Sequence, residues 1–231
     1  MKTTALILAA GKGKRMGGKI PKQYMELEGY PIIYYTIEVF QKSFIDEIIM
    51  VVGEGEQRYC EKEIVKKYGF NKVKKIVEGG KERYHSVYNG LKAIEKGGYV
   101  YIHDGARPFI TEEILWNIQK EVEKNKACIV GVPVKDTIKL VSRENIVIDT
   151  PERKKLWQIQ TPQVFEYSII MEAYKKIIKE EDSTITDDAM VVEKMLGYPI
   201  KVVEGSYGNI KITTPDDIFV AKELMKSQGR E

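Results

Sequence analysis

Cysteine and histidine are scarce in this sequence, which has two of each among its 231 residues. Cys60 and Cys128 stand far apart with no CxxC spacing, which indicates neither a zinc site nor a disulfide scaffold and favours a reducing cytoplasm. Two histidines also leave no Ser/His/Asp or Cys/His arrangement for covalent catalysis. No set of metal ligands is therefore expected from the protein itself.

The sequence also has no apolar run long enough to cross a bilayer, so no membrane partner is expected. The segment most similar to a targeting signal lies at the start, where Lys2 precedes TALILAAG as a basic residue precedes the apolar run of a secretory signal. This apolar stretch is short for a signal core and runs directly into GKGKR. It is more typical of a buried strand that enters a functional loop.

A strong excess of one charge is missing as well, because 37 basic and 34 acidic side chains give a formal net charge of +3. So balanced a chain is not expected to bind nucleic acid, and cationic binding must come from local placement, which suits a small anionic substrate. With 43% apolar and 31% charged residues, the chain can bury a full core. Without repeats, low-complexity tracts or Pro/Gly-rich linkers, a single domain over 1–231 is predicted.

Short apolar runs rich in β-branched residues alternate along the chain with longer amphipathic stretches. Strands are expected at 5–10, 46–52, 73–78, 99–104 and 127–134, with two more within 199–214, and helices at 32–41, 57–68, 85–95 and 112–124. A closing helix is expected after Thr214, an N-cap followed by Pro215. This order predicts a Rossmann-like α/β fold with a doubly wound, mostly parallel sheet. Its ligands should bind beyond the carboxyl ends of the strands.

Residues 136–148 break the alternation, because DTIKLVSRENIVI is typical of two strands joined by a polar turn. A lone hairpin is marginal in water, so Ile138, Leu140, Ile146 and Ile148 need a cover. That cover is either this chain's own core, as for an ordinary edge hairpin, or a second copy. We delimit the predicted β-hairpin arm as residues 134–156.

The loop after the first strand, LAAGKGKRMGGKIPKQ, carries the strongest chemical signal. Gly11 and Gly13 let backbone amides approach an anion closely. The same loop concentrates cations: Lys12, Lys14, Arg15, Lys19 and Lys22. Glycines interleaved with cations directly after a buried strand favour an anion cradle over a merely solvated basic loop.

Two commoner phosphate motifs do not fit this loop. In the dinucleotide fingerprint GxGxxG, Met16 stands where the third glycine belongs. In the phosphate loop of ATPases and kinases, Ile20 replaces the hydroxyl that binds magnesium, and Pro21 disfavours the helix that should follow. A dehydrogenase and a kinase or ATPase are therefore disfavoured.

Further motifs span nearly the whole chain: LAAGxGxRM followed by PKQ, then GGxERxxSV, HDGARP, PVKDT, LWQIQTPQ, ITDDA and NIKITTPDD. In this order and spacing they resemble the 2-C-methyl-D-erythritol 4-phosphate cytidylyltransferases of the non-mevalonate isoprenoid pathway. The opening motif alone is shared by many sugar-nucleotide transferases and indicates only a nucleotidyltransferase fold. HDGARP and ITDDA look more like the methylerythritol enzymes than the ribitol-phosphate ones.

The resemblance implies transfer of CMP from CTP to 2-C-methyl-D-erythritol 4-phosphate, giving 4-diphosphocytidyl-2-C-methyl-D-erythritol and pyrophosphate. Both reacting phosphates are negative, so charge repulsion and alignment are the obstacles. The attacking oxygen is already ionised and needs no general base. By analogy with the family, Arg15 and Lys22 neutralise the triphosphate and the transition state, and Mg²⁺ is held mainly by the phosphates of CTP.

Other site residues follow from the same resemblance. Positions near the nucleotide are Ala9, Ala10, Gly11, Gly13, Gly80, Ser86, Asp104 and Gly105. Positions in the pocket of the sugar-alcohol phosphate are Asp104, Arg107, Thr137, Thr161 and Thr186, and Arg153 and Lys211 position that substrate for attack. Lys81 stands where many relatives carry another residue, so no side-chain contact to the base is assigned to it. Arg83 either orders its loop or contacts a ligand, Arg107 either meets the phosphate or forms a salt bridge, and His103 is expected to be satisfied structurally.

Members of this family exchange the hairpin arm between two subunits. The resemblance therefore implies a homodimer in which Arg153 and Thr137 of one subunit reach the site of the other. Two other functions stay open: a ribitol-5-phosphate cytidylyltransferase, and a nucleotide-binding protein of the same fold without turnover. The residues expected to act in catalysis are all present, which favours an active site: Arg15, Lys22, Arg153 and Lys211.

Overall fold

The centre of the molecule is one seven-stranded sheet with the strand order β11-β7-β10-β6-β1-β4-β5. The computed structural model describes residues 1–11, 21–180, 182 and 184–229. The strands of this sheet are β1 (Lys2–Ala9), β4 (Glu47–Val52), β5 (Val73–Glu78), β6 (Gly98–Asp104), β7 (Ala127–Pro133), β10 (Trp157–Glu166) and β11 (Lys201–Glu204). Parallel pairing joins β1 with β4 and β6, β4 with β5, and β7 with β11. The predicted mostly parallel sheet is confirmed.

Strand β10 is the exception, because it runs antiparallel to both β6 and β7. This stretch is recognised in the sequence only as a motif, and the strand is not predicted. Its sequence WQIQTPQVFE alternates apolar and polar residues only over 157–160, and its pairing shifts register between Ile159 and Gln163. Two of its polar side chains, Gln160 and Gln163, are nevertheless buried in the interior.

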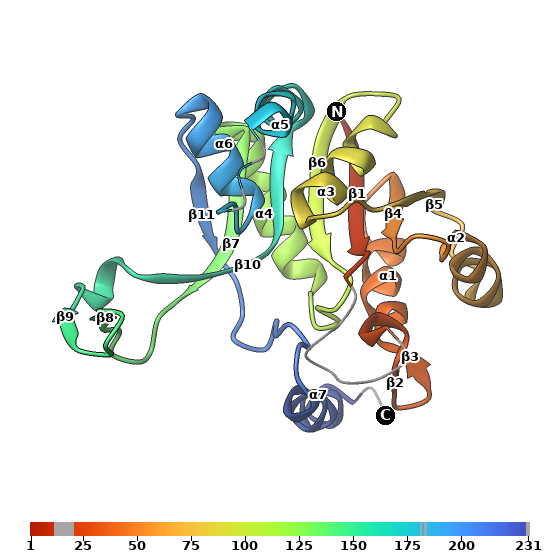
Figure 1. Ribbon diagram of the computed structural model, residues 1–231. Coiled ribbons are helices and arrows are strands. Elements are labelled where there is room, and N and C mark those ends of the chain that lie inside the picture. Colours follow the sequence, from red (N-terminus) through yellow and green to blue (C-terminus); the bar gives the residue numbers. More distant parts are fainter. Residues whose placement is uncertain (12–20, 181, 183, 230–231) are drawn as a thin grey trace.

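Helices cover both faces of the sheet, as expected for a doubly wound fold (Figure 1). One face packs against α1 (Ile32–Lys42), the π-helix η3 (Cys60–Lys66) that continues α2 (Gln57–Tyr59), and α4 (Glu112–Asn125). The other packs against α3 (Arg83–Lys92), α5 (Tyr167–Glu180) and α6 (Asp188–Leu196). Helices α5 and α6 are not among the helices predicted from the sequence.

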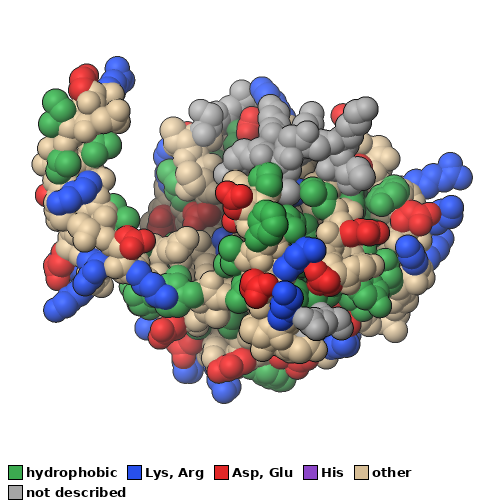
Figure 2. Space-filling view, turned by 90° about the horizontal axis from the view of Figure 1, so that it is seen from below, with side chains coloured by type: hydrophobic (Ala, Val, Ile, Leu, Met, Phe, Trp, Pro, Cys, Tyr) green, Lys and Arg blue, Asp and Glu red, His purple; other side chains and the backbone are tan. Residues whose placement is uncertain are grey.

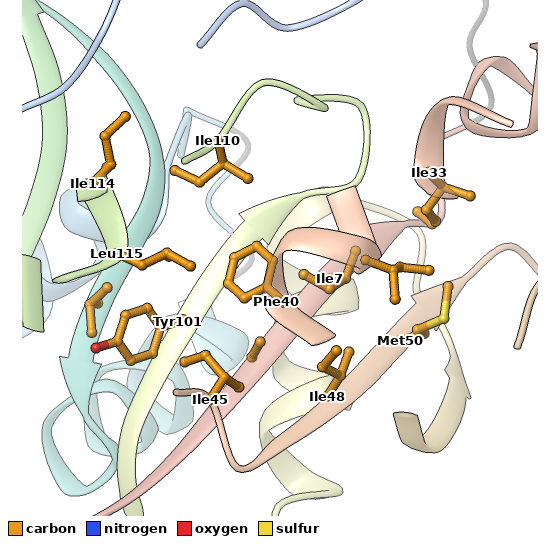
Figure 3. Packing of buried hydrophobic residues seen from close by; sticks show 14 of the residues in the cluster. Ile7, Ile33, Phe40, Ile45, Ile48, Met50, Tyr101, Ile110, Ile114 and Leu115 are labelled. Carbon is orange, nitrogen blue, oxygen red and sulfur yellow. The ribbon is translucent and has the colours of Figure 1, made fainter. Parts of the chain in front are cut away.

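Apolar side chains at helical spacing explain how these helices pack. In α1, Ile33, Ile37 and Phe40 lie on one face and are buried in the core cluster that includes residues of β1 and β4. Figure 3 shows Ile33 and Phe40 of this face together with Ile7 of β1 and Met50 of β4. Both cysteines are also buried in this layer, Cys60 in η3 and Cys128 in β7, and both are free thiols.

The arm leaves the sheet where β7 ends and returns where β10 begins (Figure 1). Its base is closed by a hydrogen bond from the Val134 amide to the Leu156 carbonyl at 3.0 Å. Further out, β8 (Leu140–Val141) pairs antiparallel with β9 (Val147–Asp149), so the predicted hairpin is confirmed with shorter strands. A short 3-10 turn, η4 (Arg153–Lys155), follows.

The body of this chain leaves the apolar side chains of the arm open to solvent. Ile146 is 66% exposed, Ile148 is 68% exposed, and Leu140 is 51% exposed. Figure 2 shows the arm standing away from the body, with hydrophobic and basic side chains beside one another. The hairpin therefore lacks a cover from the described part of its own chain.

The last part of the chain crosses the edge of the sheet where the parallel strands end. Of the two strands predicted within 199–214, only β11 forms, so the prediction of the second strand is wrong. Instead of pairing with a strand, the Ile212 amide donates to the carbonyl of Ala106, in the loop after β6, at 2.8 Å. Helix α7 (Pro215–Ser227) then begins with the predicted N-cap, since the side chains of Thr214 and Asp217 form a capping box. It packs over the small hairpin of β2 (Glu26–Leu27) and β3 (Tyr30–Pro31).

Candidate active site

A cavity of about 520 Å³ opens at the carboxyl ends of the parallel strands. It collects residues that follow β1, β5 and β6, together with the 3-10 turn η2 (Lys22–Tyr24) and the segment before α7. The lining residues are Leu8, Ala9, Ala10, Gly11, Lys22, Gln23, Gly80, Lys81, Glu82, Arg83, Ser86, Asp104, Ala106, Lys211 and Thr213. This is the edge at which an α/β sheet of this kind binds ligands.

The first side of the cavity comes from the end of β1 and from η2. The side chain of Gln23 donates to the Ala9 carbonyl, which fixes η2 against the strand. Lys22 Nζ donates to the Ile212 carbonyl at 3.0 Å and so lies near the segment that carries Lys211. Gly13 and Arg15, which the sequence analysis assigns to this loop, lie outside the described residues.

The second side comes from the glycine loop between β5 and α3. Ser86 Oγ accepts from the Gly80 amide at 3.0 Å and donates to the Glu82 carbonyl at 3.2 Å, so the loop is tied to the start of the helix. A Cβ on Gly79 would stand 2.4 Å from the Cβ of Ala10, and only glycine permits this close approach of the loop to β1. Backbone groups of two loops therefore face the same space.

Asp104 stands at the end of β6 among three cations. Its carboxylate lies 2.8 Å from Lys211 Nζ, 3.6 Å from Arg107 Nε and 3.8 Å from Arg83 Nε. Burial alone would raise the pKa of Asp104, but Lys211, Arg83 and Arg107 outweigh it and hold that pKa below its usual range. The carboxylate is therefore ionised, and it fixes Lys211 at the wall of the cavity.

Arg83 has a second partner, which decides its structural role. Its two Nη atoms donate to the carboxylate of Asp188 at 2.8 and 2.7 Å, and the Tyr174 hydroxyl donates to the same carboxylate at 2.5 Å. Asp188 is fully buried at the start of α6. The bidentate pair ties the start of α3 to α6. Asp188 and Tyr174 are not among the residues predicted for the site, although Asp188 lies within the ITDDA motif.

His103 is satisfied by protein groups, as expected. Its Nδ1 lies 3.0 Å from Thr161 Oγ1, and its Nε2 lies 3.2 Å from the Arg107 carbonyl. Burial lowers the pKa of His103 to about 4, so the imidazole is neutral at pH 7.

Three predicted residues lie just behind the cavity wall. Thr161 is buried, and its Oγ1 accepts from the Asp104 amide at 3.1 Å. Arg107 forms the salt bridge to Asp104 and donates from Nη1 to the Asn209 carbonyl at 2.8 Å. Gly105 uses its own backbone to join β6 with β1, because its amide donates to the Leu8 carbonyl at 2.8 Å.

Three other predicted residues lie apart from the lining of this chain's cavity. Thr137 and Arg153 are exposed on the arm, where Arg153 Nη1 donates to the Lys135 carbonyl at 3.0 Å. Thr186 is exposed just before α6, and its hydroxyl contacts the sulfur of Met190 at 3.6 Å. The fold thus brings Ala9, Ala10, Gly11, Lys22, Gly80, Ser86, Asp104 and Lys211 together.

Comparisons with known proteins agree with this arrangement. The family model for 2-C-methyl-D-erythritol 4-phosphate cytidylyltransferase (IspD) matches residues 3–227. Proteins of that name from Lachnoclostridium phytofermentans and Alkaliphilus oremlandii are 50% and 52% identical, covering 97% and 98% of this chain and 97% and 96% of their own. The crystal structure of 4-diphosphocytidyl-2C-methyl-D-erythritol synthase from Anaerococcus prevotii is 34% identical with a TM-score of 0.85, over 97% of this chain and 96% of that one. The chain belongs to the family of 2-C-methyl-D-erythritol 4-phosphate cytidylyltransferases.

Proposed function

We propose that this chain transfers the CMP unit of CTP to 2-C-methyl-D-erythritol 4-phosphate and releases pyrophosphate, as a step of non-mevalonate isoprenoid biosynthesis. One observation carries the proposal in detail. A glycine-lined cavity at the carboxyl ends of the strands brings Lys22 and Lys211 together in a chain of this family. Its volume of about 520 Å³ suits a nucleotide-sized ligand.

The nucleotide side is assigned to the ends of β1 and β5. Ala9, Ala10 and Gly11 line the cavity together with Gly80, which lies in the loop that Ser86 holds in place. Backbone groups at such a loop can read the edge of a base and approach phosphates without a side chain in the way. Lys22, with Arg15 and Gly13 from the loop outside the described residues, is assigned to the triphosphate.

The second substrate is assigned to the side of Lys211 and Arg107, with Thr161 and Thr186 near it. An oxygen of its phosphate forms a new bond to the α-phosphorus of CTP, and the bond from that phosphorus to the oxygen bridging to the β-phosphorus breaks. Pyrophosphate carries away the electron pair, and no proton is removed by the enzyme. Lys22 and Lys211 offset the charge that accumulates and hold the two groups in line.

Magnesium is proposed as the cation of this reaction. Within the described residues, Glu82 and Asp104 are the carboxylates that line the cavity, and no group of three or more acidic, histidine or cysteine side chains could hold a metal. Glu82 caps α3 and Asp104 is paired with cations. This donor set fits an ion held mainly by phosphate oxygens, where it would supply charge neutralisation and alignment.

We further propose that the chain is one nucleotidyltransferase domain over 1–231 that acts as a homodimer through arms at 134–156. Exposed Ile146 and Ile148 support this, because an uncovered hairpin is marginal in water. In this arrangement the arm of one subunit supplies Arg153 and Thr137 to the cavity of its partner. In the part of the chain that the structure describes, no helix is long and apolar enough to span a membrane. Two buried free thiols suit the cytoplasm that we assign.

Pyrophosphate release tests the function. The protein is incubated with CTP and Mg²⁺, and with either 2-C-methyl-D-erythritol 4-phosphate or ribitol 5-phosphate. We expect rapid release of pyrophosphate with 2-C-methyl-D-erythritol 4-phosphate and not with ribitol 5-phosphate. A strong preference for ribitol 5-phosphate would assign the chain to the second polyol, and CTP binding without release would make it a non-catalytic nucleotide-binding protein. Lys211→Met should abolish release, while the matched control Lys62→Met, on the exposed face of η3, should leave it unchanged.

A further inference from the structure

A closed ring of hydrogen bonds lies behind the cavity wall. The Asp104 amide donates to Thr161 Oγ1 at 3.1 Å, and Thr161 Oγ1 lies 3.0 Å from His103 Nδ1. His103 Nε2 lies 3.2 Å from the Arg107 carbonyl, and Arg107 Nη1 donates to the Asn209 carbonyl at 2.8 Å. Asn209 Nδ2 closes the ring by donating to the Thr161 carbonyl at 2.9 Å.

The positions of the protons in this ring follow from its partners. The Arg107 carbonyl can only accept, so Nε2 of the neutral His103 must carry the proton. Nδ1 is then unprotonated and can only accept, and its partner is the hydroxyl of Thr161. Because a threonine hydroxyl has one proton, Thr161 has none left to donate to a substrate.

The ring joins β10 to the two segments that carry Asp104, Arg107 and Lys211. Asp104 ends β6, Thr161 lies in the middle of β10, and Asn209 lies two residues before Lys211. Thr161 is 4% exposed and is not among the residues that line the cavity. The resemblance had implied that Thr161 lines the pocket of the sugar-alcohol phosphate. In the structure its hydroxyl instead bonds to the Asp104 amide and to His103.

We propose that Thr161 and His103 are positioning residues, which act on the reaction by holding Asp104, Arg107 and, through Asn209, Lys211. Neither side chain touches the substrates. The inference rests on the proposed function, because it explains how the groups assigned to the second substrate keep their places.

The first test reads the imidazole directly and needs no turnover. The chain has only two histidines, so ¹⁵N spectra of the side chains can be assigned with His85→Gln. At pH 7 we expect His103 as the neutral tautomer with the proton on Nε2 and a bare Nδ1. A proton on Nδ1 would overturn the proposal. This result stands even if the protein releases no pyrophosphate, so failure of the ring and failure of the proposed function are distinguishable.

The second test removes the hydroxyl without changing the shape of the side chain. Thr161→Val should lower kcat at saturating concentrations of both substrates by about tenfold or more, because misplaced groups cost rate. Thr161→Ser keeps the hydroxyl and should restore most of the rate. Thr4→Val is the matched control, since Thr4 is a buried threonine of β1 whose hydroxyl bonds to Glu47 at the far end of the strand. Thr4→Val should lose about as much stability to urea as Thr161→Val does, and it should keep the wild-type kcat.

The third test separates positioning from direct contact. His103→Phe keeps a ring beside Phe40 but removes both nitrogen contacts. If Thr161 acts through the ring, His103→Phe lowers kcat as Thr161→Val does, and the double variant is no slower than either. If Thr161 instead touches the substrate, His103→Phe keeps the wild-type kcat and Thr161→Val chiefly raises KM for the sugar-alcohol phosphate. That result would overturn the proposal.

Discussion

Asp104 is a carboxylate in a site that must receive anions, and its neighbours explain why it is tolerated there. Lys211, Arg107 and Arg83 surround it, so the cations outnumber it. Without it, three positive side chains would repel one another and Lys211 would lose the partner that aims it. The carboxylate therefore organises a cationic site rather than opposing it.

Removing this charge tests that account. Asp104→Asn should lower the free energy of unfolding by about 3 kcal/mol, because it leaves three partly buried cations without their counter-charge. Urea unfolding at pH 7 measures the loss. Asp136→Asn, on the exposed arm, serves as the control and should change stability little. Equal stability of the two variants would show that the cluster is not held by Asp104.

The buried imidazole predicts how stability depends on pH. Burial lowers the pKa of His103 from 6.5 to about 4, so between these values the unfolded chain binds more protons than the folded one. The contribution of His103 is complete above pH 6.5 and is lost as pH falls towards 4. The pKa of Asp104 is also lowered in the folded protein, so Asp104 adds a further loss of stability as pH falls below the ordinary pKa of an aspartate. Urea midpoints of the wild type should fall over this range, and His103→Phe should fall less steeply.

At the scale of elements, the ion pair between Arg83 and Asp188 joins α3 to α6, two helices that are far apart in the sequence. Arg83→Lys keeps the charge but loses the fork, so one of the two charged hydrogen bonds to Asp188 disappears. We expect the free energy of unfolding to fall by about 2 kcal/mol. Arg58→Lys, on the exposed turn of α2, should be neutral in the same urea titration. A neutral Arg83→Lys would mean that a lysine can serve this buried carboxylate as well.

Most elements with apolar periodicity were predictable from the sequence, although α5 was missed despite its apolar residues at helical spacing. Strand β10 shows what was not predictable. Its apolar alternation stops after residue 160, yet Gln163 Oε1 accepts from the Asp188 and Ala189 amides and Gln160 Nε2 donates to the Ser206 carbonyl. These partners are distant in sequence, so local pattern cannot reveal why a polar strand is buried. The second strand predicted within 199–214 does not form for the converse reason, since Ile212 is apolar but its amide bonds to the Ala106 carbonyl in a loop.

The candidate site was predictable to the extent that motifs name residues. Lys22, Asp104 and Lys211 were chosen from motifs far apart in the chain, and the fold brings them to one cavity. Their mutual contacts were not predictable, because ion pairs such as Lys211 with Asp104 depend on how separate segments cross the sheet edge. For the same reason the burial of Thr161 behind the wall was missed.

At the scale of the whole molecule, the arm determines where a complete site can form. Arg153 lies on the arm and Lys22 in the body, and only the latter lines the cavity of its own chain. If arms are exchanged, each site takes Lys22 from one subunit and Arg153 from the other. The assembly would then follow two-fold symmetry.

Mixing two inactive variants tests this arrangement. Lys22→Ala and Arg153→Ala chains, unfolded and refolded together in equal amounts, should regain about one quarter of wild-type activity. Half of the dimers would then be mixed, and each mixed dimer holds one intact and one doubly altered site. Pyrophosphate release measures the recovery, and each variant refolded alone is the control. No recovery, with dimers confirmed by sedimentation, would mean that each subunit keeps its own arm.

The two thiols lie in different parts of the molecule, and this makes them natural reporters of how it opens. Burial raises the pKa of both Cys60 and Cys128 to about 12, so neither reacts with an alkylating reagent while its surroundings stay closed. Cys60 packs beside Met50 through η3, whereas Cys128 sits in β7 between β10 and β11. Alkylation followed by mass spectrometry would thus time the loosening near the two opposite edges of the sheet separately, with no label to introduce.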